Sequence, residues 1–231
     1  QLRANLLRSI SHDLRTPLTS ISGNANNLLS NGNLFDTKTK EQMYTDIYDD
    51  AMWLINLVEN LLSVSRLEEG RMNLHVSTEL MDEIVAEALR HINRKSVEYH
   101  LNVQSSDEYL LVQVDAKLII QVIINIVDNA IKYTPPGSEI DIGWRKQENF
   151  VYVSVSDNGP GIPDQAKPHI FDMFYSVSNQ IADSRRSMGL GLALCKSIIN
   201  AHGGEITITD QLPHGSIFTF SVPAGEVELH E

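Results

Sequence analysis

The chain of 231 residues, 42% hydrophobic and 21% charged, is long enough for one or two domains and has the balance of a folded globular protein rather than a disordered one. Its formal net charge of -12 argues against direct nucleic-acid binding, which draws on clustered Lys and Arg. The single cysteine, Cys195, excludes an internal disulfide and a multi-thiol metal site, and it is typical of a reducing compartment.

No stretch of the sequence predicts a membrane span. The longest apolar run, residues 118–127, is interrupted by Gln121 and Asn125 and is shorter than the roughly 20 residues that a spanning helix needs. A signal peptide is not evident either. Because the chain begins with Gln1 inside a helical pattern, we interpret it as a fragment of something longer, and we expect no membrane contact by this fragment.

Apolar residues at helical spacing predict two long amphipathic helices in the first 70 residues. One stripe runs from Leu7 to Leu28 and the other from Met43 to Leu61, with a polar break at residues 30–35. Each stripe is too rich in large apolar residues to be buried by one partner helix. We therefore expect a helical hairpin that forms a four-helix bundle in a homodimer.

The first helix carries a histidine on its polar side. At about 100° per residue, His12 lies roughly 200° from Leu14 and so faces away from the buried stripe. Asp13 adjoins it, Thr16 follows one turn later, and Pro17 predicts a bend beside it. A neutral imidazole is a competent nucleophile near pH 7, and a carboxylate can hold its tautomer. An isolated pair of this kind is more often simply solvated surface.

Beyond Gly70 the pattern changes to alternating helices and strands. This change predicts a boundary near residues 70–78 and domains at 1–70 and 71–231. The order of the elements favours an α/β sandwich. Helices are expected at 79–94, at 115–133 and from about 189, and strands at 97–103, 110–114, 139–145, 151–156, 205–209 and 216–222. The segment 158–188 far exceeds the usual connection of about 4–6 residues, which is typical of a functional loop.

Three motifs in the second half have the chemistry of a nucleotide site. Asn125 and Asn129 lie one turn apart on one face of the predicted helix, with Lys132 nearby, and this set suits Mg²⁺ and phosphate. Taken alone, it equally suits a capped, partly buried polar helix end. The other two motifs, Asp157-Asn158-Gly159-Pro160-Gly161 and Met188-Gly189-Leu190-Gly191-Leu192, allow close backbone approach and place N–H groups at a helix start. Each of these alone is only a turn signal.

Ser11-His12-Asp13-Leu14-Arg15-Thr16-Pro17-Leu18 resembles the phospho-acceptor box of sensor histidine kinases. The order of asparagine helix, aspartate–glycine turn, long loop and second glycine turn is similar to that of ATPases of the gyrase, Hsp90, histidine kinase and MutL superfamily. The resemblance implies an α+β fold: an N-terminal helical hairpin dimerising into a four-helix bundle, then an α/β sandwich ATP-binding domain. It implies that His12 is phosphorylated, that Asp13 is its acid/base partner and that Thr16 orients water during dephosphorylation of a partner.

The same resemblance implies ATP and Mg²⁺ as ligands. Asn129 would be the Mg²⁺ ligand with Asn125 beside it, Lys132 would lie near the phosphates, Tyr133 against the nucleotide, and Asp157 would accept the adenine amino group. The remaining implied ATP-binding residues are Gly159, Gly161, Phe171, Phe174, Arg185, Arg186, Gly189, Leu190, Gly191 and Leu192. Arg185 and Arg186 fall in the long segment 158–188, the predicted lid of the site, and paired arginines in a lid are more often solvated than catalytic. Relatives commonly have glycine where this chain has Ser187, which puts the lid conformation in question.

As a function, the resemblance implies autophosphorylation on His12, transfer to an aspartate in the receiver domain of a response regulator, and phosphatase activity toward that regulator. It also implies that this is the cytoplasmic portion of a bacterial membrane sensor. Residues 9–25 and 188–199 are most similar to the potassium-responsive members of the family. Two alternatives remain open: a nucleotide-binding module acting mainly as a regulator phosphatase or scaffold, and an ATP-driven clamp, which would lack the His12 hairpin.

Overall fold

The computed structural model describes residues 2–68, 74–92, 98–105, 109–173, 175 and 189–226; the side chains of 2–13 and 63–68 lie outside the described part. The chain divides into two compact units, Gln1–Ser65 and Arg66–Glu231. None of the helices in the described residues combines the length and apolar character that a membrane crossing requires.

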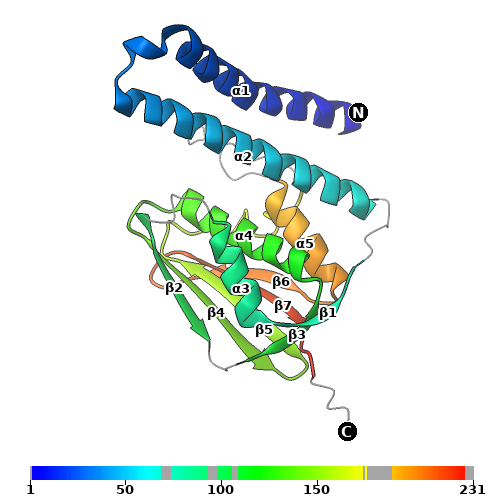
Figure 1. Cartoon of the computed structure of the whole chain (residues 1–231). Coiled ribbons are helices and arrows are strands. Elements are labelled where there is room, and N and C mark those ends of the chain that lie inside the picture. Colours follow the sequence, from blue (N-terminus) through cyan, green and yellow to red (C-terminus); the bar gives the residue numbers. More distant parts are fainter. Residues whose placement is uncertain are drawn as a thin grey trace. The chain divides into compact units, whose positions relative to one another are not determined.

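The first unit is built from the two predicted helices, α1 (Leu2–Asn31) and α2 (Thr37–Glu68), joined through the short 3₁₀ helix η1 (Gly32–Leu34). Figure 1 shows them running in opposite directions as a hairpin. Helix α1 continues through Pro17. Helix α2 begins after Asp36, whose carboxylate accepts the N–H of Thr39 at 2.7 Å and so satisfies a first-turn donor. The prediction of two helices with a polar break is confirmed.

A row of large apolar side chains on α2 is exposed in the single chain. At about 100° per residue these side chains fall within an arc of about 120° on one side of the helix. Tyr48 is 57% exposed, Ile55 50% and Leu62 53%. We call this row the α2 stripe; it consists of Tyr44, Tyr48, Met52, Ile55, Val58 and Leu62. A row of this size in water lacks the cover that amphipathic helices normally obtain from a partner.

The second unit contains a five-stranded sheet in the order β2-β4-β5-β7-β6 and a two-stranded sheet of β1 and β3. Strands β2 and β4 are parallel, and all the other pairs are antiparallel. Figure 1 shows α3, α4 and α5 together on one side of the larger sheet. The strands are β1 (Ser77–Leu80), β2 (His100–Ser105), β3 (Leu111–Val114), β4 (Glu139–Gln147), β5 (Phe150–Asp157), β6 (Ile206–Asp210) and β7 (Ser216–Pro223). The helices are α3 (Met81–Arg90), α4 (Ala116–Tyr133) and α5 (Gly191–Ala201).

The core of this unit lies between the larger sheet and the helices. Along β5 buried residues alternate with half-buried ones, because successive side chains of a strand point to opposite faces. Val153 of β5, Phe220 of β7 and Ile123 of α4 are completely buried in one apolar cluster. A helical layer on one face of a mixed sheet confirms the predicted sandwich.

Sequence periodicity misplaced several element boundaries, the start of α3 among them. The helix predicted at 79–94 begins only at Met81, because Glu79 and Leu80 belong to β1, which pairs antiparallel with β3. Thr78 pairs with Gln113 and Leu80 with Leu111. A four-residue strand directly before a helix gives too short an alternation to be recognised, and its pairing partner lies far along the chain.

Candidate functional site

Helix α4 carries the two asparagines predicted to lie on one face. Asn125 and Asn129 are both half-buried, and within the described part of the chain the buried side-chain nitrogen of Asn125 has no hydrogen-bond partner. Nearer the end of the helix, the Lys132 ammonium lies 5.2 Å from the centroid of the Tyr133 ring, which is itself 47% exposed. The helix thus presents polar groups along its last turns, where a ligand can reach them.

The start of α5 contacts the asparagine face of α4. A Cβ placed on Gly191 would lie 3.6 Å from both Cγ and Oδ1 of Asn125, so the glycine backbone lies directly against this amide. Gly189 has a φ of 64°, which glycine adopts readily, and Leu190 is buried. Leu192 is half-buried. The second glycine turn and the asparagine motif, far apart in sequence, therefore meet in the fold.

A buried histidine joins the beginning of α4 to the end of α5. His202 Nε2 accepts the backbone N–H of Asp115 at 3.0 Å, and its Nδ1 donates to the carbonyl of Ile198 at 2.8 Å. Because Nδ1 faces a carbonyl, which can only accept, that nitrogen carries the proton. This histidine thereby fixes the N-terminal end of α4 to the C-terminal end of α5.

Asp157 ends β5 and is only 8% exposed. Its Oδ1 accepts the N–H of Gly159 at 2.9 Å, and its backbone pairs with Ser216 of β7. Burial raises the pKa of this carboxyl above its usual value, while hydrogen bonds from the backbone of Gly159 and Ser216 act in the opposite direction. A buried carboxylate of this kind favours a ligand that brings its own N–H donor.

The turn after Asp157 depends on glycine for close packing. A Cβ on Gly159 would lie 2.5 Å from the methyl carbon of Thr134, at the end of α4. Gly161 has a φ of 76°, and a Cβ there would lie 3.2 Å from the carbonyl oxygen of Gly215. A Cβ on Gly215 would in turn overlap the carbonyl oxygen of Asp157 at 1.8 Å. The segments at 157–161 and at Gly215 therefore pack backbone to backbone, and the Thr134 methyl group packs against the same turn.

Sequence reasoning missed four residues of this site. Thr134, which is buried, packs its methyl group against Gly159; Gly215 and Ser216 back Asp157; and His214 Nδ1 donates to the carbonyl of Gly159 at 3.1 Å. Of these residues, Ser216 was visible only as the start of a predicted strand. Nothing local to these residues signals that they pack against Asp157, because the contact arises from the pairing of β5 with β7.

Phe171, one of the implied ATP-binding residues, is half-buried against the sheet. Its ring meets Phe218 edge to face at 6.3 Å, and the Lys196 ammonium lies 5.9 Å from its centroid. Its side chain is therefore held by the core of the second unit. The predicted partners Phe174, Arg185 and Arg186 lie outside the described residues.

On the first unit, the side chains of His12 and Asp13 also lie outside the described residues, although the backbone at both positions is helical. Thr16 is exposed on α1. An open cavity of about 730 Å³ follows along the same helix, lined by Leu14, Arg15, Leu18, Thr19, Ser22, Gly23 and Asn26. The described residues contain no group of three or more His, Cys, Asp or Glu that could hold a metal ion.

Two family models match the chain. Residues 2–70 match the His Kinase A (phospho-acceptor) domain, and residues 114–226 match the histidine kinase-, DNA gyrase B- and HSP90-like ATPase. Sensor protein KdpD of Clostridium acetobutylicum is 44% identical over 96% of this chain and 25% of its own length. Sensor protein KdpD of Escherichia coli is 33% identical over 100% and 26%. The chain thus spans about a quarter of the length of these curated relatives.

Solved structures agree with this assignment. The catalytic domain of histidine kinase ThkA is 31% identical, with a TM-score of 0.57 over 64% of this chain and 95% of that chain. ThkA in complex with the response regulator protein TrrA is 26% identical, with a TM-score of 0.69 over 96% of this chain and 61% of that chain. The likeness to these histidine kinase structures therefore extends over both units of the chain.

Proposed function

Because the chain belongs to the sensor histidine kinases of two-component systems, we propose that it transfers the γ-phosphoryl group of ATP to His12 and then to an aspartate of a response regulator. The observation that carries the nucleotide half of this proposal is the contact of Gly191 with Asn125, together with the buried Asp157 nearby in the same unit. Domains of residues 1–70 and 71–231 would divide the work, the first accepting phosphate and the second binding nucleotide.

For the nucleotide, we propose that adenine donates its amino group to the Asp157 carboxylate, beside the turn that Gly159 and Gly161 shape. The N–H groups at Gly189, Leu190 and Gly191 lie at the positive end of the α5 dipole, where phosphate oxygens are stabilised. Lys132 adds a positive charge, and Tyr133 offers an exposed ring. Phe171, Phe174, Arg185, Arg186 and Leu192 complete the proposed ATP-binding set.

The donor chemistry of α4 suits magnesium. Amide oxygens are ligands that Mg²⁺ accepts, and Asn125 and Asn129 lie one turn apart on α4. We propose Asn129 as the Mg²⁺ ligand, with Asn125 beside it. The bound ion would neutralise charge on the β- and γ-phosphates.

For transfer, the free imidazole nitrogen of His12 forms a bond to the γ-phosphorus while the bond to the bridging oxygen breaks and ADP leaves. Asp13, its neighbour on α1, holds the proton on the other ring nitrogen, and Thr16 orients water when the regulator is dephosphorylated. Positioning and charge neutralisation supply most of the rate, since little else in phosphoryl transfer is left for the protein to do.

The proposed partners are a second copy of this chain and a response regulator receiver domain. The exposed α2 stripe supports the first, because pairing of two hairpins would cover it. The structure of ThkA in complex with a response regulator supports the receiver domain as a partner. The long KdpD relatives support a further proposal: this chain is the cytoplasmic part of a membrane sensor in a potassium-regulated system.

Incubation with radiolabelled ATP tests the proposal. The protein should acquire acid-labile, base-stable label that is absent from His12→Ala, while both proteins bind a non-hydrolysable ATP analogue equally. Nucleotide binding without label on the unaltered protein would favour the module that acts as a phosphatase or scaffold. Absence of nucleotide binding would overturn the proposal itself.

A further inference from the structure

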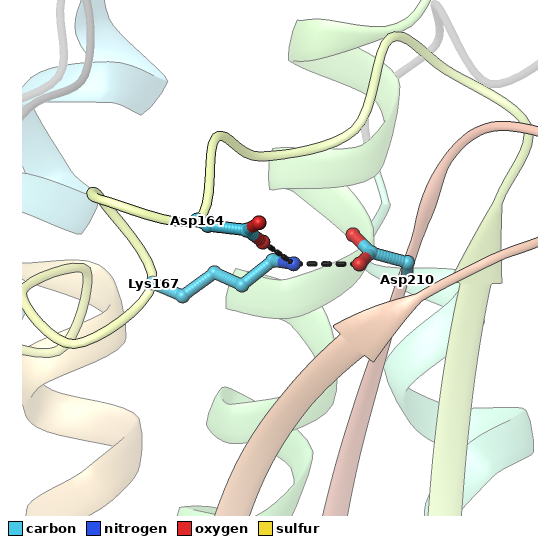
Figure 2. Close-up of polar contacts among 3 residues, drawn as sticks. All are labelled: Asp164, Lys167 and Asp210. Atoms are coloured by element: carbon cyan, nitrogen blue, oxygen red, sulfur yellow. Dashed lines mark hydrogen bonds and ion pairs between the residues drawn. The ribbon is translucent and has the colours of Figure 1, made fainter.

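Lys167 bridges two carboxylates from different parts of the second unit. Its Nζ lies 2.6 Å from Asp164 Oδ1 and 2.6 Å from Asp210 Oδ2, and Figure 2 shows the ammonium between the two. Asp164 and Lys167 belong to the segment that follows the Asp157 turn, whereas Asp210 is the last residue of β6. The ammonium therefore joins two segments that are distant in the sequence.

The environment of the three groups sets Lys167 apart from an ordinary surface lysine. Its side chain is 19% exposed, compared with 58% for Asp210 and 92% for Asp164. Hydrogen bonds to the two carboxylates raise the pKa of Lys167, and the same contact lowers the pKa of Asp164. The lysine is thus held as a cation by an acidic neighbour on either side.

A second contact joins the same two segments on the other side of the turn. His214 Nδ1 lies 3.1 Å from the carbonyl oxygen of Gly159, and because that oxygen can only accept, the ring nitrogen is the donor. The chain between Asp210 and Ser216 forms a turn in which the Gln211 N–H donates to the Gly215 carbonyl at 3.1 Å. We call residues 210–216 the β6–β7 loop.

Two side chains join the β6–β7 loop to the segment 157–167: Asp210 through an ion pair with Lys167, and His214 through a hydrogen bond to Gly159. The backbone of Gly215 also packs against Asp157. One of these contacts lies within the Asp157–Gly161 turn and the other lies six residues beyond its end, so together they restrict the conformations that the turn can adopt. A ligand that binds one conformation gains apparent affinity when that conformation is the populated one.

We propose that Lys167, Asp210 and His214 are positioning residues that hold the Asp157–Gly161 turn in its nucleotide-binding conformation. The inference rests on the proposed function, in which this turn receives adenine. These residues touch no phosphate and take no part in transfer. Their loss raises the Kd and KM for ATP and leaves the autophosphorylation rate at saturating ATP unchanged.

The two aspartates provide a matched pair of variants. Asp210→Asn removes the carboxylate that spans the two segments, whereas Asp164→Asn removes the one on the same segment as Lys167. Each replacement removes one negative charge that neighbours the Lys167 ammonium. We expect Asp210→Asn and Lys167→Met to weaken binding of a non-hydrolysable ATP analogue about two- to fivefold, the range of a partly exposed ion pair. Asp164→Asn and the exposed-lysine variant Lys117→Met should bind as the unaltered protein does.

A double-mutant cycle and a salt series separate positioning from general loss of stability. Lys167→Met with Asp210→Asn should bind no more weakly than either single variant, because both remove one contact. The difference from the unaltered protein should shrink in 1 M salt, where the screening length falls to about 3 Å. At the other point, His214→Ala should weaken binding and His214→Asn, which keeps a donor, should restore part of it.

Equal effects of Asp164→Asn and Asp210→Asn, or a fall in the saturating rate with unchanged KM, would overturn this inference while leaving the proposed function intact. Failure of the unaltered chain to bind the analogue would instead reject the proposed function. Thermal unfolding without nucleotide, measured for each variant, identifies any loss of affinity that follows only from unfolding.

Discussion

At the scale of single residues, burial of the Asp128 carboxyl on α4 lowers the free energy of unfolding at neutral pH. Burial raises its pKa from 3.8 to about 6. The folded protein therefore holds a proton that the unfolded chain releases, so the free energy of unfolding falls as the pH rises between these values. The loss is at most about 3 kcal/mol, since one pKa unit corresponds to about 1.4 kcal/mol. We expect Asp128→Asn to unfold at higher urea concentration at pH 7.5.

The same two proteins at lower pH supply the control. At about pH 3 and below the carboxyl is mostly protonated in both the folded and unfolded states, and the advantage of Asp128→Asn should disappear. An advantage that stays constant between about pH 3 and pH 7.5 would show that the gain does not come from titration of Asp128.

At the scale of elements, the join between β6 and β7 depends on one glycine. Gly215 has a φ of 123°, and a Cβ there would overlap the carbonyl oxygen of Asp157 at the end of β5. Gly137 also has a positive φ, of 85°, but a Cβ there meets nothing within 4 Å. We expect Gly215→Ala to destabilise the second unit by several kcal/mol and Gly137→Ala by only about 1 kcal/mol. Urea unfolding of both variants measures the difference.

Both variants carry the strain of a positive φ, at 123° and 85°, and Gly215→Ala adds the steric overlap. Equal destabilisation would mean that the backbone of β5 yields to the added methyl group. In that case the close packing around Asp157 would not be what fixes the turn.

At the scale of the whole molecule, we predict that the α2 stripe forms the dimer interface. The first unit exposes six large apolar side chains on one side of α2. A charge introduced there would have to be desolvated in a helix–helix interface. We therefore expect the chain to have twice its 25.9 kDa mass in light scattering, and the double variant Tyr48→Lys, Ile55→Lys to have the mass of a monomer.

Tyr109→Lys is the matched control, because Tyr109 is 75% exposed but lies on the second unit. It should remain dimeric. A dimer that survives the changes on α2 would place the interface elsewhere. Mixing His12→Ala with Asn129→Ala subunits then reads out transfer across the dimer, since label returns in the mixture only when one subunit phosphorylates the other.

Periodicity and local motifs were enough to predict both hairpin helices, the positions of α4 and α5 and most strands. These are local properties: Asn125 and Asn129 share a face wherever a helix is formed, and glycines at 159 and 161 indicate a turn without any neighbour. The resemblance of the Ser11–Leu18 box to a known family also lies within a few consecutive residues. The family matches over residues 2–70 and 114–226 confirm that assignment.

Only the tertiary structure decided which distant segments meet. Pairing of β5 with β7 brings Ser216 to Asp157, Gly191 packs against Asn125, and Lys167 reaches Asp210. Short β1 was missed for the same reason, since its partner β3 lies beyond α3. Each contact depends on a strand order or helix packing set by burial of the whole apolar core. No window of sequence contains that information, because the free energy that selects the pairing belongs to all the elements together.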